Sequence, residues 1–373
     1  MGLNEVNLEP VGRSYFAVWI GAATHHHRYP LINEGQRVGE LACVVESKHI
    51  ELRRSAMLYR RIVIPKIVLL TMIFSGIVQS IAAQSILGID NLVEPGSAEC
   101  IATDFKFTEG PVWHPNGYLL FSDIVGNTIY KWTPDGQVTV FRSPSGHANG
   151  LTLDSQGRLI ACEHSNRRVS RTEIDGTIAT LADSYNGKKL NSPNDVVVKS
   201  DGSIYFTDPP YGLDAVMGIA AKQELSFSGV YRITPDSKNI QLLVDDASPN
   251  GLAFSPDEKM LYIPNDMNSG LVVFDVLPDG TLGKRRQLAN LHGWTDGMKI
   301  DMLGNLYIAT GYFDIKIYDK NGAPLGKIYI PEATTNCAFG GPENKTLFVT
   351  AGSSVYRVQM KVQGALAESI PQL

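Results

Sequence analysis

The chain has 373 residues, of which 43% are hydrophobic and 19% are charged, and its formal net charge is −5. This composition is that of a globular chain rather than a disordered one, and the length suits one large β domain. The acidic balance argues against nucleic-acid binding, for which a basic stripe is expected. The sequence has no P-loop, no G-x-S-x-G elbow and no H-E-x-x-H motif, so nucleotide-binding, serine-hydrolase and zinc-protease functions lose support.

The first 83 residues differ from the remainder. Residues 57–83 begin with basic residues, continue through an uncharged apolar stretch at 67–78 and end in the small residues Ala82 and Ala83. This order predicts a secretory signal peptide, and the apolar stretch is short for a membrane span. The alternative is a cytosolic protein with an N-terminal apolar helix, or an uncleaved anchor. Because a signal peptide works at a true N-terminus, we interpret residues 1–56 as an upstream extension, disordered or untranslated.

Residues 84–373 would then be the mature protein, periplasmic or secreted, with 24 basic and 32 acidic residues. No stable membrane association is expected after cleavage, and the sequence does not reveal the oligomeric state. Three cysteines remain in this part, at positions 100, 162 and 337, so at most one disulfide can form within the chain. None is predicted, because Cys162 and Cys337 lie in or beside predicted strands, where free buried thiols are more common.

One unit recurs six times from residue 109 onward. In each unit a polar residue precedes an apolar run, a turn and a second apolar run, as in EGPVWHPNGYLLFSD. The polar residues follow one another at spacings of 40, 45, 56, 46 and 40 residues, and they are Glu109, Asn149, Asn194, Asn250, Asp296 and Asn336. A period in this range with several short strands per unit predicts an all-β fold, a six-bladed β-propeller.

Two irregularities refine this prediction. The third unit is lengthened by an insert near 213–228, and insertions in repeat folds fall in loops on one face, often the binding face. The last unit is one strand short, so we expect the segment 98–107 to join it and close the ring.

The six polar residues would form a ring of side-chain oxygens at one mouth of the central channel. Two carboxylates and four amides suit Ca²⁺, which takes ~6–8 oxygen ligands, whereas Zn²⁺ would need His or Cys. Taken singly, Asn-Gly and Asp-Gly pairs more often form turns. Turn preference gives no reason for Glu109, however, so the common register favours a site for a divalent cation.

Four of these positions carry a family resemblance. The segments TEGPVW, LNSPNDVVV, SPNGLAFS and TDGMKID, which hold Glu109, Asn194, Asn250 and Asp296, resemble the metal-site motifs of the SMP-30/gluconolactonase/LRE-like family. The resemblance covers roughly residues 95–360. It is closest to the bacterial gluconolactonases, through HANGLTLD, CEHSNRRVSR and FTDPPYG.

The resemblance implies a six-bladed propeller that holds one divalent cation, usually Ca²⁺, and hydrolyses lactones such as D-glucono-1,5-lactone. Glu109, Asn250 and Asp296 correspond to direct metal ligands, and Asn194 to a ligand or a residue that touches substrate. Asp296 corresponds to the family's catalytic base as well. Asn149 corresponds to a substrate contact, whereas Asn336 is interpreted as mainly structural.

A metal-bound carboxylate is a weak base, so a neighbour could share the proton transfer. The candidates are Asp208, in the TDPPYG turn, and His147, two residues before Asn149; both are also predicted substrate contacts. Their ordinary interpretations are a turn-forming aspartate and a loop histidine. His164 is interpreted as structural.

The animal members of the family carry an arginine that holds the sugar lactone at the position of Ser192, so substrate identity is open. Two other functions fit the same ligand motifs. One is a calcium-dependent phosphotriesterase-like hydrolase, and the other is a non-catalytic binding propeller with a structural cation.

Overall fold

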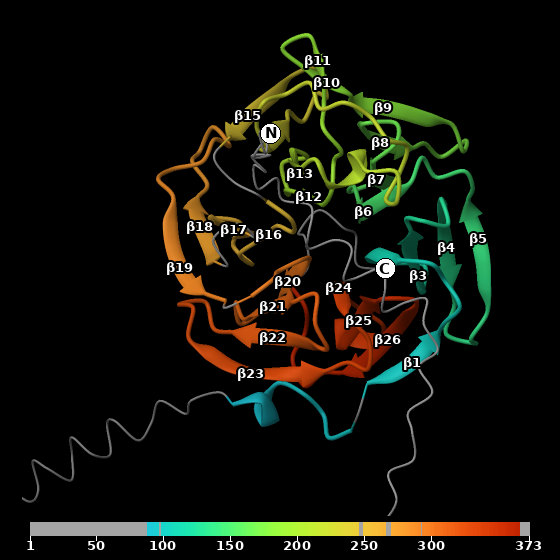
Figure 1. Cartoon of the computed structure of the whole chain (residues 1–373). Coiled ribbons are helices and arrows are strands. Elements are labelled where there is room, and N and C mark those ends of the chain that lie inside the picture. The colour runs from blue at the N-terminus through green and yellow to red at the C-terminus, as the bar shows by residue number, and fades with distance from the viewer. Residues whose placement is uncertain (1–87, 97, 246–248, 266–269, 292, 366–373) are drawn as a thin grey trace, which may run out of the picture. The chain divides into compact units, whose positions relative to one another are not determined.

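The computed structural model describes residues 88–96, 98–245, 249–265, 270–291 and 293–365. In this part of the chain six four-stranded antiparallel sheets are arranged around a central axis, which confirms the predicted six-bladed β-propeller (Figure 1). In five of these sheets the strands follow one another outward in chain order, and in the sixth β24, β25 and β26 are followed by β1, so the first strand of every repeat unit lies next to the axis. The blade sequences alternate apolar runs with Gly-containing turns, as antiparallel hairpins require.

The first three blades have the following strands: β2 (Thr108–His114), β3 (Tyr118–Asp123), β4 (Thr128–Trp132) and β5 (Val138–Arg142); β6 (Ala148–Leu153), β7 (Leu159–Glu163), β8 (Arg168–Thr172) and β9 (Ile178–Ala182); β12 (Val196–Val198), β13 (Ile204–Asp208), β14 (Gly229–Ile233) and β15 (Ile240–Val244). A small hairpin, which the sequence analysis did not predict, precedes the third blade: β10 (Ser184–Tyr185) and β11 (Lys188–Lys189).

The last three blades have the following strands: β16 (Ala253–Phe254), β17 (Met260–Asn265), β18 (Gly270–Asp275) and β19 (Arg286–Asn290); β20 (Met298–Ile300), β21 (Leu306–Ala309), β22 (Asp314–Tyr318) and β23 (Pro324–Tyr329); β24 (Thr334–Gly340), β25 (Thr346–Ala351), β26 (Ser354–Gln359) and β1 (Glu99–Ala102). Short 3₁₀ turns complete the described elements: η1 (Ile89–Asn91), η2 (Tyr211–Leu213) and η4 (Pro342–Asn344).

The ring closes as predicted. β1 pairs with β26 as the outer strand of the last blade, so residues near 100 complete a sheet whose other strands come from 334–359 (Figure 1). Thr108 then begins the first blade, and Thr335 Oγ1 donates to its carbonyl oxygen at 2.8 Å. This closure gives the last blade four strands, as in the other five blades.

The core lies between the blades. Each buried apolar cluster combines residues of two neighbouring blades, such as Leu119 and Phe121 of the first with Phe348 and Val355 of the last. A sheet buried on both faces reads as a continuous apolar run, which is why the second strands β3, β7 and β13 each contain three or four consecutive apolar residues. Among the described residues, Cys162 and Cys337 are buried free thiols and Cys100 is an exposed one.

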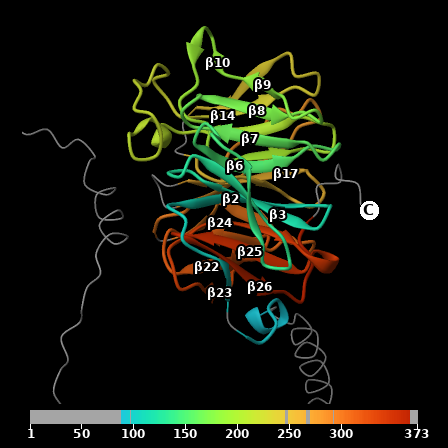
Figure 2. The same cartoon turned by 90° about the vertical axis from the view of Figure 1, so that its right-hand side faces the viewer.

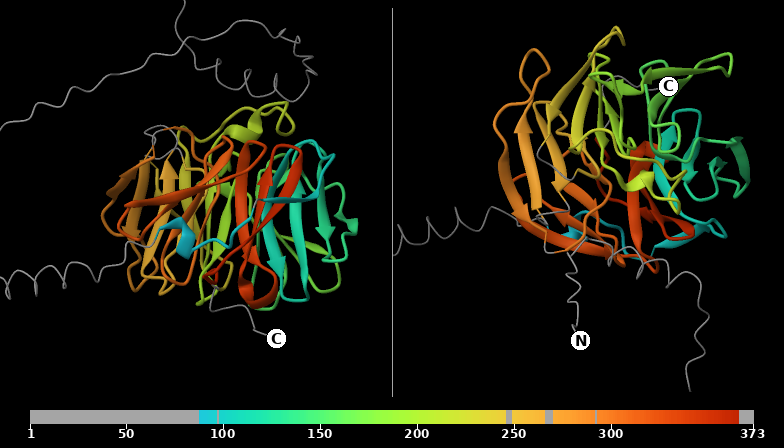
Figure 3. Two further views of the ribbon diagram at one scale, coloured as in Figure 1. Left: turned by 90° about the horizontal axis from the view of Figure 1, so that it is seen from below. Right: turned by 45° about the horizontal axis from the view of Figure 1, so that its top comes forward.

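The insert lies between β13 and β14, at residues 209–228, and contains η2. Figure 3 shows this segment on one face of the propeller. The segment follows the end of β13, which pairs with the start of the inner strand β12. The predicted extension at 1–56 and the predicted signal peptide at 57–83 fall outside the described residues. None of the helices described here is long and apolar enough to cross a membrane.

Candidate active site

The six polar residues predicted at one register are brought together at one end of the axis. Three pairs of consecutive members are linked by hydrogen bonds. Two links join backbone atoms: Gly150 N donates to Asn194 O at 2.7 Å, and Gly251 N donates to Asp296 O at 3.2 Å. The third runs through the Thr207 hydroxyl, which accepts from Asp195 N and donates to Asn250 O. Figure 2 shows the inner strands β24, β2 and β6 side by side. We call these six residues the upper ring.

Glycines allow the ring to be this tight. Gly110 has a φ of +50°, and a Cβ atom on it would lie 2.0 Å from the carbonyl oxygen of Asn149. A Cβ on Gly297 would meet the side chain of Asn336 at 2.0 Å. The glycines that follow upper-ring residues therefore allow close packing between inner strands, and the Asn-Gly pair at Asn149 lies inside β6 rather than in a turn.

β-Bulges occur at the upper ring in three blades. The register of the inner strand shifts between Glu109 and Val112 in β2, between Ala148 and Leu151 in β6, and beside Asn336 in β24. A bulge places an extra residue in one strand and turns its side chain in a new direction. These bulges redirect the ring residues at the strand entrance.

Glu109 is buried, and its carboxylate is held on one side only. Its Oε2 accepts hydrogen bonds from Gly110 N at 2.6 Å and from Asn336 Nδ2 at 3.1 Å, which leaves Oε1 as the oxygen for a cation. Burial raises the pKa of Glu109 to about 7, against the opposing effect of the Gly110 bond. Asn336 uses both ends of its amide, since its Oδ1 accepts from Cys337 N, in agreement with a structural role.

The other predicted ligands differ in how firmly they are held. Asn250 Nδ2 donates to Thr295 O at 3.4 Å, so its Oδ1 is the end available to a cation. The buried side chain of Asn194 makes no hydrogen bond within the described part of the chain. Asp296 is half-buried, and its backbone is fixed by a bond from its N–H to Ala309 O at 2.9 Å.

Asp195 is a site residue that the sequence analysis missed. It is buried, its Oδ1 accepts from Val196 N at 2.9 Å, and its Oδ2 is buried with no hydrogen-bond partner. Its charge also contributes to the raised pKa of Glu109, whose largest cause is burial. The sequence does contain a feature that could have indicated Asp195. Four residues of the upper ring are followed by glycine, whereas Asn194 is followed by an aspartate.

The residues present fit a hard divalent cation. They supply carboxylate and amide oxygens, and a buried carboxylate oxygen without a partner is costly unless a positive charge or a donor lies near it. Within the described residues, no three His, Cys, Asp or Glu side chains form a metal-binding group, because most donors of the upper ring are asparagines.

Asn149 is oriented by a histidine. Its Nδ2 lies 3.2 Å from His164 Nε2, and His164 Nδ1 lies 3.2 Å from the carbonyl oxygen of Met217 in the insert. Burial lowers the pKa of His164 to about 4, so the ring is neutral near pH 7. The amide orientation leaves Asn149 Oδ1 for the mouth of the channel.

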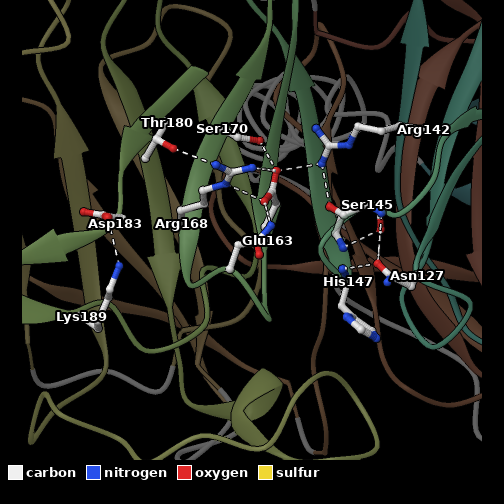
Figure 4. Close-up of polar contacts among 12 residues, drawn as sticks. Asn127, Arg142, Ser145, His147, Glu163, Arg168, Ser170, Thr180, Asp183 and Lys189 are labelled. Atoms are coloured by element: carbon white, nitrogen blue, oxygen red, sulfur yellow. Dashed lines mark hydrogen bonds and ion pairs between the residues drawn. The ribbon is translucent and has the colours of Figure 1, made fainter. Parts of the chain in front are cut away.

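His147 is fixed beside it. Its backbone φ is +54°, and its N–H donates to Asn127 Oδ1 at 2.8 Å (Figure 4). Its Nδ1 lies 2.8 Å from Ser165 Oγ, and burial lowers its pKa. The His147 imidazole is partly buried, and its Nδ1 is the nitrogen held by Ser165.

A buried carboxylate fixes the strand end that carries these contacts. Glu163 bonds Arg142 at 2.9 Å and Arg168 at 2.7 Å, and Figure 4 shows it between the two guanidinium groups. Ser170 Oγ donates to the same carboxylate. Because His164 and Ser165 follow directly, this cluster sets the position of the turn after β7.

Residues 107–353 match the family described as the SMP-30/Gluconolactonase/LRE-like region. The chain belongs to this family. Its resemblance to the family, expected from four motifs, is thereby confirmed, and so is the likeness to a bacterial gluconolactonase.

The relatives in this family include enzymes. The gluconolactonase of Zymomonas mobilis is 36% identical over 294 residues, which cover 71% of this chain and 82% of that protein. The solved structure of a gluconolactonase from Xanthomonas campestris is 35% identical with a TM-score of 0.69, covering 73% of this chain and 92% of that one. A calcium-binding regucalcin from Agrobacterium tumefaciens, 20% identical with a TM-score of 0.62 over 72% of this chain and 95% of that one, shares the fold.

Two further residues of this SMP-30/gluconolactonase-like site, Ser192 and Asp208, have buried side chains. Ser192 is fully buried and ties down the insert, since its Oγ donates to Pro209 O at 2.6 Å and accepts from Gly212 N at 2.9 Å. Asp208 is also fully buried: its Oδ2 accepts from Asn191 N at 2.8 Å and its Oδ1 has no partner. A substrate contact by Asp208 stays a prediction and would require movement of this segment.

Proposed function

We propose that this protein hydrolyses a sugar lactone, with D-glucono-1,5-lactone as the type substrate, and that a divalent cation, Ca²⁺, is held by Glu109, Asn194, Asn250 and Asp296. The observation that carries the proposal is the closed upper ring of oxygen donors in a chain of a family whose members include gluconolactonases. The lactone-hydrolysing class is supported by these relatives. The cation and the particular lactone are the finer parts of the proposal.

Lactone hydrolysis adds water to the ring carbonyl carbon, and the ring C–O bond then breaks to give a hydroxy acid. When bound, the cation would supply a Lewis acid for the oxygen that becomes negative. The protein must position the lactone, remove a proton from the attacking water and return one to the departing ring oxygen. These are tasks for side chains around the ring.

Asp296 is proposed as the base that accepts the water proton. Its carboxylate is half-buried, unlike that of Glu109, so it can reach a water at the mouth. Asn149 Oδ1 and the His147 imidazole are proposed to bind the hydroxyl groups of the lactone. His147 can also share the proton transfer, because its lowered pKa leaves it neutral near pH 7.

The proposed location is outside the cytoplasm, in the periplasm or the medium, as the signal-like order of residues 57–83 suggests. Expression of the full chain, followed by sequencing of the N-terminus of the exported protein, tests this. A first residue at 83 or 84 in an exported fraction is expected, and retention of residues 1–83 would contradict it.

The function is tested by lactone opening, because each turnover releases a proton that a pH indicator can follow. The chain from residue 84 is assayed with D-glucono-1,5-lactone, then after EDTA, then with Ca²⁺ restored. Activity that is lost and regained is the expected result. A folded, Ca²⁺-binding protein without lactonase activity would instead favour a phosphotriester substrate or a binding propeller.

A further inference from the structure

The insert at 209–228 is attached to two consecutive residues of another blade. His164 and Ser165 lie in the turn after β7, and each bonds the backbone of the insert. Each also contacts a predicted substrate residue, Asn149 in the first case and His147 in the second. The two pairs of contacts form parallel connections from the insert to the mouth.

The first connection fixes a tautomer. Met217 O can only accept, so the 3.2 Å contact with His164 Nδ1 requires a hydrogen on that nitrogen. The neutral ring then has a lone pair on Nε2, which accepts from Asn149 Nδ2 at 3.2 Å. His164 thus binds the insert through Nδ1 and orients the amide of Asn149 through Nε2.

The second connection runs through a hydroxyl group. Ile219 N donates to Ser165 Oγ at 2.9 Å, and the same oxygen lies 2.8 Å from His147 Nδ1. The Ser165 backbone is held as well, since its N–H donates to Gly146 O at 3.1 Å. His147 is therefore placed by the segment that holds Ile219.

Two glycines bring the insert close enough for these bonds. A Cβ on Gly212 would lie 2.2 Å from His164 Cγ, and a Cβ on Gly218 would lie 3.0 Å from Ser165 Oγ. Neither glycine has a positive φ, so the constraint is space rather than backbone conformation. The insert thus packs directly against the two connecting residues.

We propose that His164 is a positioning residue for the lactonase site: it couples the insert, as a wall of the substrate mouth, to the amide orientation of Asn149, and Ser165 couples the same wall to His147. The inference rests on the proposed function for its kinetic readout but not for its structural one. It gives His164, interpreted from sequence as merely structural, a role in substrate binding.

Two substitutions separate the two bonds of His164. The amide of His164→Asn can take the place of Nδ1 and donate to Met217 O, while the contact with Asn149 is lost. The longer His164→Gln can take the place of Nε2 and accept from Asn149, while the contact with Met217 is lost. Gly212→Ala presses on the imidazole and should resemble His164→Gln.

The experiment combines steady-state kinetics with amide hydrogen exchange of residues 209–228. His164→Asn should raise KM about 3- to 10-fold, the range for one hydrogen bond, with the exchange of the insert unchanged. His164→Gln should speed exchange in the insert and also raise KM. In both variants Ca²⁺ affinity should equal that of the wild type, because no proposed ligand touches His164.

His114 provides a matched control. It is a partly buried histidine at the end of β2, away from Glu109 at the start of that strand, and its two ring nitrogens contact Gly157 O and Asn116 N. His114→Asn should cost a similar amount of stability and leave KM unchanged. If the two His164 variants unfold, Ser165→Ala is the second test and should raise KM while the protein stays folded.

A wild-type KM in His164→Asn and Ser165→Ala, or a loosened insert with wild-type KM in His164→Gln, would overturn the proposal. Failure of the proposed function is distinguishable, since then the wild type itself opens no lactone. The exchange measurement needs no turnover and would still decide whether His164 holds the insert.

Discussion

Two levels of the inner strands carry opposite side-chain chemistry. The upper ring carries a polar oxygen-bearing side chain in every blade. Three residues further along each inner strand lies a second set, which we call the lower ring: Val112, Thr152, Val197, Ala253, Lys299 and Phe339. Apart from Thr152 and Lys299 this set is apolar, and all but the buried Ala253 are half-buried. The repeat supplies equivalent sequence positions at both levels, so the difference in side-chain composition confines the proposed chemistry to the level of the upper ring.

The largest expected effect separates the two levels directly. Asp296→Asn in the upper ring should lower kcat/KM for lactone opening by about 10²- to 10⁴-fold, because a proton acceptor is removed. Thr152→Val in the lower ring has nearly the same shape as the wild type and should leave kcat/KM unchanged. If both variants show wild-type thermal unfolding and equal activity, the proposed difference between the two levels is contradicted.

Glu109→Gln tests the charge of the upper ring. Gln retains the acceptor for Gly110 N and for Asn336 but removes a carboxylate, so Ca²⁺ affinity in a calorimetric titration should fall about 100-fold. The fold should survive, since the charged side chain is itself costly to bury. An unchanged titration would remove Glu109 from the proposed site.

Asp208→Asn tests a carboxylate that belongs to neither level. Burial raises the pKa of Asp208 to about 7, so the folded state binds this proton more tightly than the unfolded state does. The folding stability that the bound proton contributes is fully present below the usual pKa of an aspartate and is lost as the pH rises through about 7. The variant should therefore be more stable than the wild type at pH 8, by about 2–4 kcal/mol, and similar to it at pH 4. Urea unfolding at both pH values measures this. A raised KM in the same variant would support the substrate contact predicted from sequence.

Asp195→Asn tests whether the proposed cation site includes a carboxylate beyond the six residues of the upper ring. If its unpartnered Oδ2 adds charge beside the cation, the variant should bind Ca²⁺ about 10-fold more weakly. Val196→Ala is the control, because it keeps the carboxylate and its bond to the backbone. Identical affinities in Asp195→Asn and the wild type would reduce Asp195 to a residue that fixes the start of β12.

Lys299→Met tests the exception in the lower ring and should give the smallest effect. Burial is the largest effect on the pKa of Glu109 and raises it, whereas the Lys299 charge lowers it by favouring the ionised carboxylate. The Lys299 charge is therefore near enough to the upper ring to repel a cation. Its removal should raise Ca²⁺ affinity about 3-fold at high pH and leave kcat unchanged. A loss of affinity would mean that Lys299 organises the upper ring rather than opposing its ligand.

Much of the fold followed from local patterns in the chain. Repeated apolar runs with turn residues such as Gly117 and Gly136, both at positive φ, predicted the blades and their hairpins. The missing strand predicted that residues near 100 would close the ring, and β1 does so. The hairpin β10–β11 and the bulge at Glu109 were not predicted, because neither changes the apolar pattern.

The site was predicted in part. The common register of the upper ring was visible because each member occupies the same place in its own repeat. The roles of Asp195, His164 and Ser165 were not visible, and the Asn-Gly pairs carry no sign that they pack against a neighbouring carbonyl. Asp208 looked like a turn residue at the mouth, yet its side chain is fully buried.

The sequence by itself determined the number of blades, the way the ring closes and the level at which polar residues gather, since each depends on the pattern inside one repeat and on its period. Only the tertiary structure decided which of those residues are held, and by what. His164 and Met217 are 53 positions apart, and Asn336 and Glu109 are 227 apart. Contacts over such separations depend on how one blade packs on the next, which no local pattern records.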